Sequence, residues 1–288
     1  MEELKLAART TKAYSSDVYA KIDALRLMDD TFMSKVFDGQ KDAAALLLQI
    51  ILDDPEIKVI SVRTQVEIKN LQGRSVRLDI RAKDSHGRIL VIEIQRADPG
   101  ASRKRARNIS SMLDANALNP QDAVENLPET YVIFITENDV LGKGLPIYHI
   151  DRTIAETGEQ FGDQEHIIYV NGENTDDTAL GKLMHDFKCT KASDMNYSVL
   201  AKRVRYFKET QEGRQGMSDI VKEYAAEVAK KYAKEQKDKF IRQTIIKGFR
   251  EGIYTKDNVS ILYPGIKSDE IDDLYRKAQR PVKRKRTA

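Results

Sequence analysis

The stretch Arg77-Leu78-Asp79-Ile80-Arg81, with Ile89-Leu90-Val91-Ile92-Glu93-Ile94-Gln95 after it, decides how this sequence of 288 residues is interpreted. In both segments a carboxylate stands among alternating apolar residues, and this alternation predicts two strands of one sheet. The connection Asp84-Ser85-His86-Gly87-Arg88 is typical of a hairpin turn, with glycine where a left-handed backbone is needed. We therefore predict a β-hairpin. Strict alternation would place one set of apolar residues on a single face, namely Val76, Leu78, Ile80 and Ala82.

A turn centred on His86 places Asp79 opposite Glu93. Residues opposed on one face have Cβ atoms about 5 Å apart, where like charges repel. A divalent cation between the carboxylates would offset the repulsion, and hard cations accept oxygen ligands, including the amide oxygen of Gln95. The pattern therefore predicts a metal site. The alternative is an ordinary solvated face, on which Arg77 or Arg81 neutralises Asp79 without a metal.

The same stretch resembles the PD-(D/E)XK nuclease family transposases, also described as recombination-promoting nucleases. Their pattern is an Asp on one strand, then an acidic residue, one spacer and Lys or Gln on the next, and Asp79, Glu93 and Gln95 occupy these positions. The likeness extends from residues 27–37, through the basic segment 103–107, to residues 131–136. It implies an α/β fold with a restriction-endonuclease-like core, in the order α-β-β-β-α-β, whose mixed sheet is flanked by helices.

The resemblance also implies an activity, that of a metal-dependent DNA endonuclease with Mg²⁺, or Mn²⁺, held by Asp79 and Glu93. Gln95 stands where many relatives carry Lys. An amide can position water but adds no charge, so catalysis would either be weaker or depend on Arg105 or Arg107 for a cation. The helix-borne acidic position of the family matches Asp30 among the catalytic residues, with Asp29 as the near alternative. A helix N-cap explains Asp30 equally well.

Two basic segments are candidates for contact with DNA. The first follows the carboxylate strands and contains Arg103, Lys104, Arg105 and Arg107. The second is the tail at 280–286, without whose five positive charges the net charge falls from +3 to −2. Nucleic-acid contacts must therefore come from local patches.

Two other functions compete with nuclease activity. One is a nuclease-fold protein that binds or regulates nucleic acid without cutting it, which failure to bind Mg²⁺ or Mn²⁺ would favour. The other is a glycosidase, whose two carboxylates can be about 5 Å apart. The chain contains no Trp and no aromatic cluster near the carboxylates, so no sugar platform supports that function.

The pattern along the chain predicts alternating elements and then a helical extension. Strands are expected at 58–68, 75–82, 89–95, 131–136 and 166–170, and helices at 19–38, 41–53, 102–118, 176–187, 194–210, 217–250 and 268–278. We place a boundary near residue 212, at Glu212-Gly213-Arg214-Gln215-Gly216, giving a nuclease-like domain (1–212) and a helical C-terminal extension with the basic tail (213–288). An apolar stripe on the long helix is typical of packing or of self-association into a homo-oligomer.

The expected location is the cytoplasm, with no membrane partner. The longest apolar run, residues 43–52, is too short to cross a bilayer. The first residues lack the order of a signal peptide, and Cys189 is the single cysteine. One Cys and four His give no zinc-type spacing, and no glycine-rich nucleotide loop is present.

Overall fold

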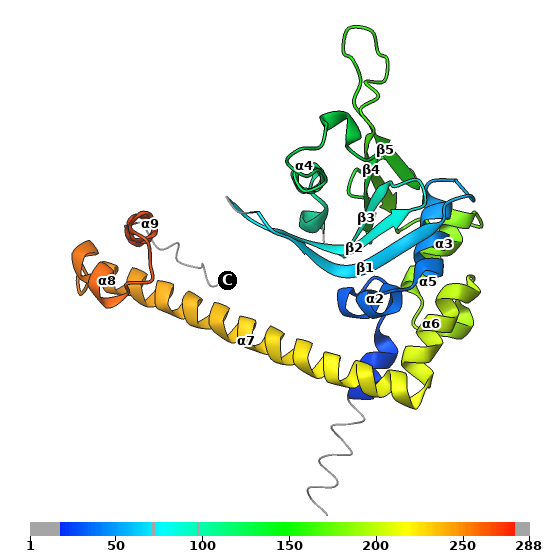
Figure 1. Cartoon of the computed structure of the whole chain (residues 1–288). Helices are drawn as coiled ribbons and strands as arrows, with labels where there is room; N and C mark the ends of the chain where they lie inside the picture. The colour runs from blue at the N-terminus through cyan, green and yellow to red at the C-terminus, as the bar shows by residue number, and fades with distance from the viewer. Residues whose placement is uncertain (1–17, 71–72, 97, 280–288) are drawn as a thin grey trace, which may run out of the picture. The chain divides into compact units, whose positions relative to one another are not determined.

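The computed structural model describes residues 18–70, 73–96 and 98–279 (Figure 1). The chain divides into two compact units, residues 1–222 and 223–288. The first contains a mixed sheet with helices on both faces, and the second is helical. No helix in the described part of the chain is long and apolar enough to cross a membrane. The basic tail at 280–288 lies outside the described residues.

The sheet of the first unit has six strands in the order β1-β2-β3-β4-β6-β5. Strands β1 and β3 each run antiparallel to β2. Strands β3, β4 and β6 run parallel to one another, and β5 is antiparallel to β6. The strands are β1 (Val59–Ile68), β2 (Val76–Asp84), β3 (Ile89–Gln95), β4 (Thr130–Thr136), β5 (Ile147–Ile150) and β6 (Glu165–Asn171). The α/β prediction and its five strands are confirmed. The short edge strand β5 was not predicted.

The predicted hairpin is formed by β2 and β3. Ile80 pairs with Ile92 in the register of a turn centred on His86. Gly87 has φ +87°, the left-handed conformation for which glycine was expected. The Asp84 carboxylate holds the turn by accepting hydrogen bonds from the backbone N–H of His86 and from both the backbone and the Nε of Arg88. The turn therefore fixes the register on which the position of the carboxylates depends.

The strict alternation predicted along β2 is wrong, because the strand changes face at Asp79. Ile80 and Ala82 belong to the apolar cluster on one side of the sheet, whereas Val76 and Leu78 belong to the cluster on the other. In the neighbouring strand, Gln65 lies between the residues paired with Ile80 and Leu78 and has φ +53°. Residues other than glycine rarely adopt this backbone conformation. The change of face therefore involves both strands at one level of the sheet.

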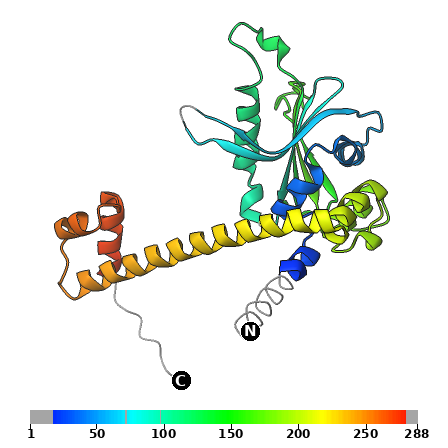
Figure 2. The same cartoon turned by 60° about the horizontal axis from the view of Figure 1, so that its bottom comes forward.

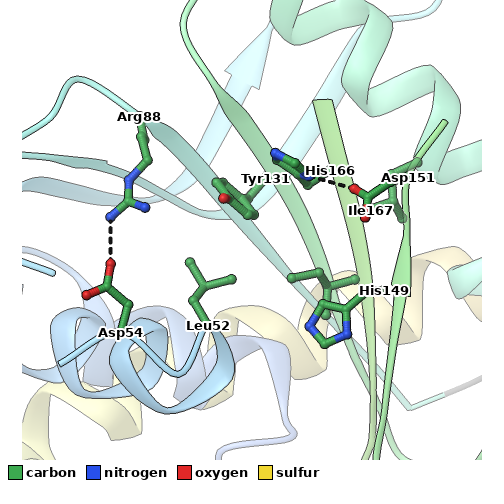
Figure 3. Close-up of a pocket in the computed structure, with 9 residues that line it drawn as sticks. Leu52, Asp54, Arg88, Tyr131, His149, Asp151, His166 and Ile167 are labelled. Carbon is green, nitrogen blue, oxygen red and sulfur yellow. Dashed lines mark hydrogen bonds and ion pairs between the residues drawn. The ribbon is translucent and has the colours of Figure 1, made fainter. Parts of the chain in front are cut away.

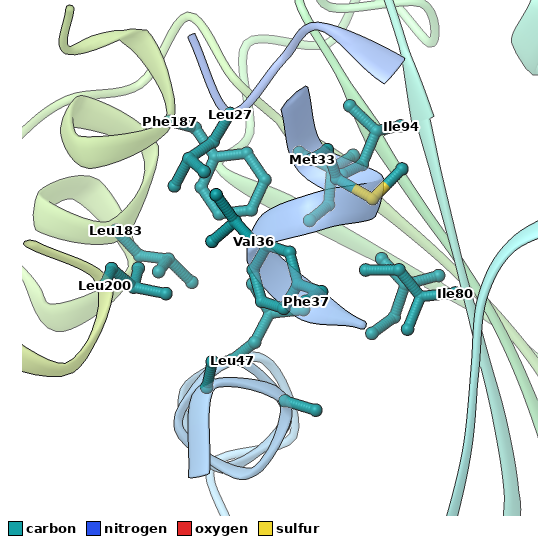
Figure 4. Packing of buried hydrophobic residues seen from close by; sticks show 14 of the residues in the cluster. Leu27, Met33, Val36, Phe37, Leu47, Ile80, Ile94, Leu183, Phe187 and Leu200 are labelled. Carbon is teal, nitrogen blue, oxygen red and sulfur yellow. The ribbon is translucent and has the colours of Figure 1, made fainter. Parts of the chain in front are cut away.

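Helices cover the two faces unequally (Figures 1 and 2). One face carries α2 (Asp30–Phe37), α3 (Lys41–Ile51), α5 (Ala179–Lys188) and α6 (Ser198–Glu209), and the other carries α4 (Arg103–Asp114). Figure 4 shows α2 between the sheet and the outer helices, with Met33 and Phe37 near Ile80 and Ile94. Ser102 caps α4 as predicted, accepting a hydrogen bond from the N–H of Arg105.

The single helix expected at 19–38 is interrupted. Residues 18–24 are helical and α2 begins at Asp30. The buried Lys208 explains the break, because its Nζ donates to the carbonyl oxygens of Asp23 and Leu25 and so takes acceptors that a continuous helix would use. It also donates to the carbonyl of Thr190. This lysine thus holds the segment that leads into α2.

The second unit contains the end of α7 (Gln211–Arg250), with α8 (Lys256–Leu262) and α9 (Ser268–Ala278). Its core consists of apolar residues from all three helices, among them Ile245, Phe249, Val259, Ile271 and Leu274. Thr255 and Asn258 cap α8 reciprocally. Helix α9 matches its prediction, whereas the seven-residue α8 was missed. Much of the expected apolar stripe on α7 falls on side chains outside the described set.

The segment 212–216, expected as a boundary, is part of α7. Gly213 is explained by close packing, because a Cβ there would lie 2.1 Å from the carbonyl oxygen of Tyr206 in α6. At the exposed Gly216, a Cβ would meet no described atom within 4 Å. The two glycines therefore have different roles, although the sequence suggested a common one.

This difference gives a prediction about stability. We expect Gly213→Ala to lower the free energy of unfolding by about 1–3 kcal/mol, because the backbone of α6 or α7 must shift. The matched variant Gly216→Ala should raise it by about 0.5–1 kcal/mol, through helix propensity alone. Urea denaturation of the two variants checks this. Equal effects would contradict the packing explanation.

Candidate active site

Asp79 and Glu93 lie side by side where the pairing of β2 with β3 ends. The last ladder pair described is Ile80 with Ile92. Beyond it, the N–H of Asp79 donates to Oε1 of Glu93 (3.1 Å), and the N–H of Ile94 donates to Oδ2 of Asp79 (2.9 Å). Each carboxylate thus accepts a backbone hydrogen bond from the opposite strand. These bonds fix the two side chains against one another.

Both carboxylates are removed from water, since Glu93 is 0% and Asp79 7% exposed. Burial, with the negative charge of Glu93 beside it, raises the pKa of Asp79 to about 7. Burial also raises the pKa of Glu93, against the lowering effect of Arg105. The pair is therefore costly to ionise, and a bound cation would favour its ionised form.

A cavity of about 840 Å³ opens at Asp79. Asp79, Gln95 and Asp30 line it, and Glu93 is hydrogen-bonded to Asp79. The structure thus brings together the residues that the sequence assigned to catalysis. The polar and basic residues that complete the wall are Arg74, Ser75, Arg77, Ser102, Lys104, Arg105 and Asn108.

Asp30 is the first residue of α2, and the N-cap position belongs to Asp29, whose side chain makes no cap hydrogen bond. The N-cap explanation of Asp30 is therefore wrong. Its carboxylate accepts a hydrogen bond from Nε2 of Gln65 (2.6 Å) and lies 3.7 Å from Arg77. Its charge contributes to raising the pKa of Asp79. Asp29 instead pairs with Arg96 and does not line the cavity.

Gln95, the last residue of β3, depends on a glycine that sequence reasoning missed. A Cβ at Gly100 would lie 1.9 Å from Oε1 of Gln95. The absence of a side chain at residue 100 therefore gives the Gln95 amide its place beside the cavity. The short helix Asp98–Ala101 carries this glycine, and no spacing in the sequence linked it to Gln95.

The basic helix α4 contributes only part of its charge to the site. Lys104 and Arg105 line the cavity, with Nη2 of Arg105 2.6 Å from Oε2 of Glu93. Arg103 lines a different, largely apolar cavity, together with Leu141 and Tyr169 among others. Arg107 is exposed and lines neither cavity. Helical spacing places 104 and 108 on one face of α4 and 105 beside them, but it does not show which face of the helix lies over the carboxylates.

The residues at the carboxylate pair fit a hard divalent cation. All the atoms available to ligate a metal are oxygens, from the carboxylates of Asp79 and Glu93 and from the Gln95 amide. Such ligands suit Mg²⁺ or Mn²⁺. Oε1 of Gln65, whose amide nitrogen bonds Asp30, is buried and has no hydrogen-bond partner in the described part of the chain. A water beside Asp30, which lines the cavity, would satisfy such an acceptor. The pair thus has the chemistry of a metal site.

A second cluster with metal-ligand chemistry has a structural explanation. The ligand atoms of His185, Asp186 and Cys189 lie within 4.8 Å of one another. The buried Asp186 carboxylate, however, accepts hydrogen bonds from the backbone N–H groups of Asn196 and Tyr197, just before α6. Burial raises the pKa of the Cys189 thiol to about 11, which opposes the thiolate that metals require. The cluster therefore anchors α6.

A smaller cavity, of about 220 Å³, lies at the start of β4 and β6 (Figure 3). The ring of His166 stacks on Tyr131, and its Nδ1 lies 2.6 Å from Asp151. Arg88 reaches Asp54 across 3.3 Å. The cavity shares no lining residue with the one over the carboxylates, and its ion pairs join separate elements of the fold. Its charged groups thus serve the packing of the first unit.

Comparison with known proteins agrees with the geometry. The family model described as PD-(D/E)XK nuclease family transposase matches residues 32–196, more than half of the chain. The matched region contains the whole sheet and α4, with Asp79, Glu93 and Gln95, and begins just after Asp30. No curated protein matched the chain, and no solved structure did.

Proposed function

Because the chain belongs to the PD-(D/E)XK nuclease family transposases, we propose that it is a DNA endonuclease that depends on Mg²⁺ or Mn²⁺. The observation that carries the proposal is the buried Asp79–Glu93 pair beneath a cavity lined by basic side chains. The carboxylates can hold the metal, and the cations around them can hold the phosphates of DNA. The first unit would carry the catalysis.

Hydrolysis of a phosphodiester requires a positioned water, stabilisation of charge on the phosphate and help for the departing oxygen. A divalent metal, when bound, stabilises that charge and lowers the pKa of water. Oδ1 of Asp79 and Oε2 of Glu93 are the oxygens to hold it, since the other two accept backbone hydrogen bonds. The Gln95 amide would orient the water, accepting from it through Oε1.

The basic residues around the cavity have a separate task. Arg74, Arg77 and Lys104 would bind phosphates on either side of the scissile bond and set the register of the DNA. Asp30, joined to Gln65, would bind a metal-ligating water or a second cation from the α2 side. The site would thus combine a negative centre for the metal with a positive border for the backbone of the DNA.

A second candidate is a nuclease-fold protein that binds DNA without cutting it. Gln95 favours it, since this position has no catalytic lysine, and so does the ion pair that Arg105 makes with Glu93. A plasmid-nicking assay in Mg²⁺, in Mn²⁺ and in EDTA separates the two candidates, with Asp79→Asn as the matched control. DNA binding combined with nicking no faster than that of Asp79→Asn would favour the non-cutting protein.

Gln95 yields the next prediction. We expect Gln95→Lys to keep or raise the rate of single-turnover cleavage, because a lysine adds a cation beside the phosphate. Gln95→Ala should lower the rate about 10–100-fold, since the amide that orients the water is lost. Gly100→Ala should lower the rate to a similar extent, because the added Cβ would displace Oε1 of Gln95.

The double variant provides the control for this prediction. If Gly100 acts by making room for Gln95, adding Gly100→Ala to Gln95→Ala should change the rate little further. Full additivity of the two effects would show that Gly100 acts elsewhere. Equal rates for the wild type, Gln95→Lys and Gln95→Ala would remove Gln95 from the mechanism.

A further inference from the structure

The guanidinium of Arg105 lies on the oxygen that a metal needs. Its Nη2 is 2.6 Å from Oε2 of Glu93, and Oε1 of the same carboxylate accepts the N–H of Asp79. Glu93 is fully buried, whereas the Arg105 side chain is 37% exposed and reaches in from the first turn of α4. The ion pair thus joins a fixed carboxylate to a long side chain that also faces the cavity.

The ion pair with Glu93 leaves one nitrogen of the Arg105 side chain without a partner within the described ranges of the chain. Its Nε is buried and has no hydrogen-bond partner in the part of the chain that the structure describes. A buried donor without a partner is unfavourable, so the bound position of the side chain is not its best-satisfied one. A nearby phosphate oxygen could accept from it, because guanidinium binds phosphate through parallel N–H donors.

The other charges near the pair do not replace Arg105. Asp30 adds a further negative charge, and Arg77 is drawn towards Asp30, at 3.7 Å, rather than towards Glu93. Among the described residues, Arg105 is the cation in an ion pair with either member of the pair. A buried carboxylate without a cation is strongly unfavourable. Arg105 therefore acts as the counter-ion built into the chain.

We propose that Arg105 is a displaceable counter-ion, which leaves Glu93 when a divalent cation binds the pair and then contacts the DNA phosphate in the cavity. The proposal rests on the proposed function and adds a regulation to it. Oε2 of Glu93 cannot accept the metal and keep Arg105 in place, because two cations so close together repel strongly. DNA, by attracting Arg105, would in turn favour the metal.

Two consequences follow. The first is that the wild-type protein binds metal more weakly than a variant without the positive charge, since binding must break the ion pair. The second is that metal and DNA bind cooperatively, because each stabilises the position of Arg105 that the other requires. The metal site would then be filled mainly in protein that is already bound to DNA.

Calorimetric titration with Mg²⁺ at pH 8 tests the first consequence on the full-length protein. We expect Arg105→Gln, and Arg105→Met as a second variant, to bind Mg²⁺ about tenfold more tightly than the wild type. The matched control is Arg63→Gln, which removes an exposed arginine of β1 that does not line the cavity and should stay within about twofold of wild type. Thermal melts establish that each variant is folded.

Titration with Ca²⁺, in place of Mg²⁺, in the presence and absence of a short DNA duplex tests the second. The duplex should raise the Ca²⁺ affinity of the wild type several-fold, and this gain should largely disappear in Arg105→Gln. A gain of equal size in both proteins would overturn the proposal.

The outcomes separate this proposal from the proposed function. If the wild type binds Mg²⁺ through Asp79, as judged by loss of binding in Asp79→Asn, but Arg105→Gln binds equally or more weakly, Arg105 supports the metal site and the proposal is wrong. The proposed function then stands. If neither wild type nor Arg105→Gln binds Mg²⁺ in an Asp79-dependent way, the proposed metal site fails, and the counter-ion proposal fails with it.

Discussion

Asp79→Asn is expected to lower the rate of single-turnover DNA cleavage by at least about 10³-fold, or about 4 kcal/mol of transition-state stabilisation. An amide cannot supply the negative charge that holds the metal. The substitution keeps the shape of the side chain and an oxygen that accepts the N–H of Ile94, so the fold should be retained. The loss would then report on chemistry rather than on folding.

The measurement is cleavage of a labelled duplex by excess protein at saturating Mg²⁺. Glu67→Gln is the matched control, because Glu67 is an exposed acid of β1 that does not line the cavity. It should cleave at the rate of the wild type. If Asp79→Asn also cleaves at that rate, the metal site has been placed wrongly.

The second large effect concerns stability and pH. The pKa of Asp79 is raised from 3.8 to about 7, so between these pH values the folded protein retains a proton that the unfolded chain has lost. Stability from this group is present below about pH 4 and is lost as the pH rises to 7. Relative to Asp79→Asn, the wild type should therefore lose on the order of 2–4 kcal/mol of its free energy of unfolding between pH 4 and pH 8.

Mg²⁺ should reverse this loss. At pH 8 and a concentration 100 times its dissociation constant, it should stabilise the wild type by about 2.7 kcal/mol and Asp79→Asn far less. Urea denaturation of the two proteins at both pH values, with and without Mg²⁺, measures the effect. A stability difference between them that is the same at pH 4 and pH 8 would contradict the buried-pair description.

The hairpin and the meeting of the two carboxylates could be predicted from the sequence, because short-range rules determine them. A turn with Gly87 at its left-handed position fixes the register, and the register fixes which residues are opposed. The change of face at Asp79 could not be predicted. It depends on the backbone of Gln65 in another strand, for which the sequence gives no signal such as glycine.

The positive wall of the cavity was predicted only in part. The sequence identified a basic helix, but only packing on the sheet decides that Arg105 faces the site and Arg103 faces elsewhere. The role of Gly100 depends on the position of the Gln95 side chain, which no sequence rule supplies. Elements of a few residues, such as β5 and α8, carry too little pattern to be recognised.

The hydrogen bonds that the carboxylates of Asp79 and Glu93 accept from the opposite strand bear on how such a protein can evolve. Each carboxylate has a structural duty besides its proposed chemical one. Alanine at either position would leave a buried N–H without an acceptor, whereas an amide would not. Mutational routes from a nuclease to a protein that only binds DNA should therefore pass through Asn and Gln at these positions. In inactive descendants of this fold, amides at both places would record the lost activity.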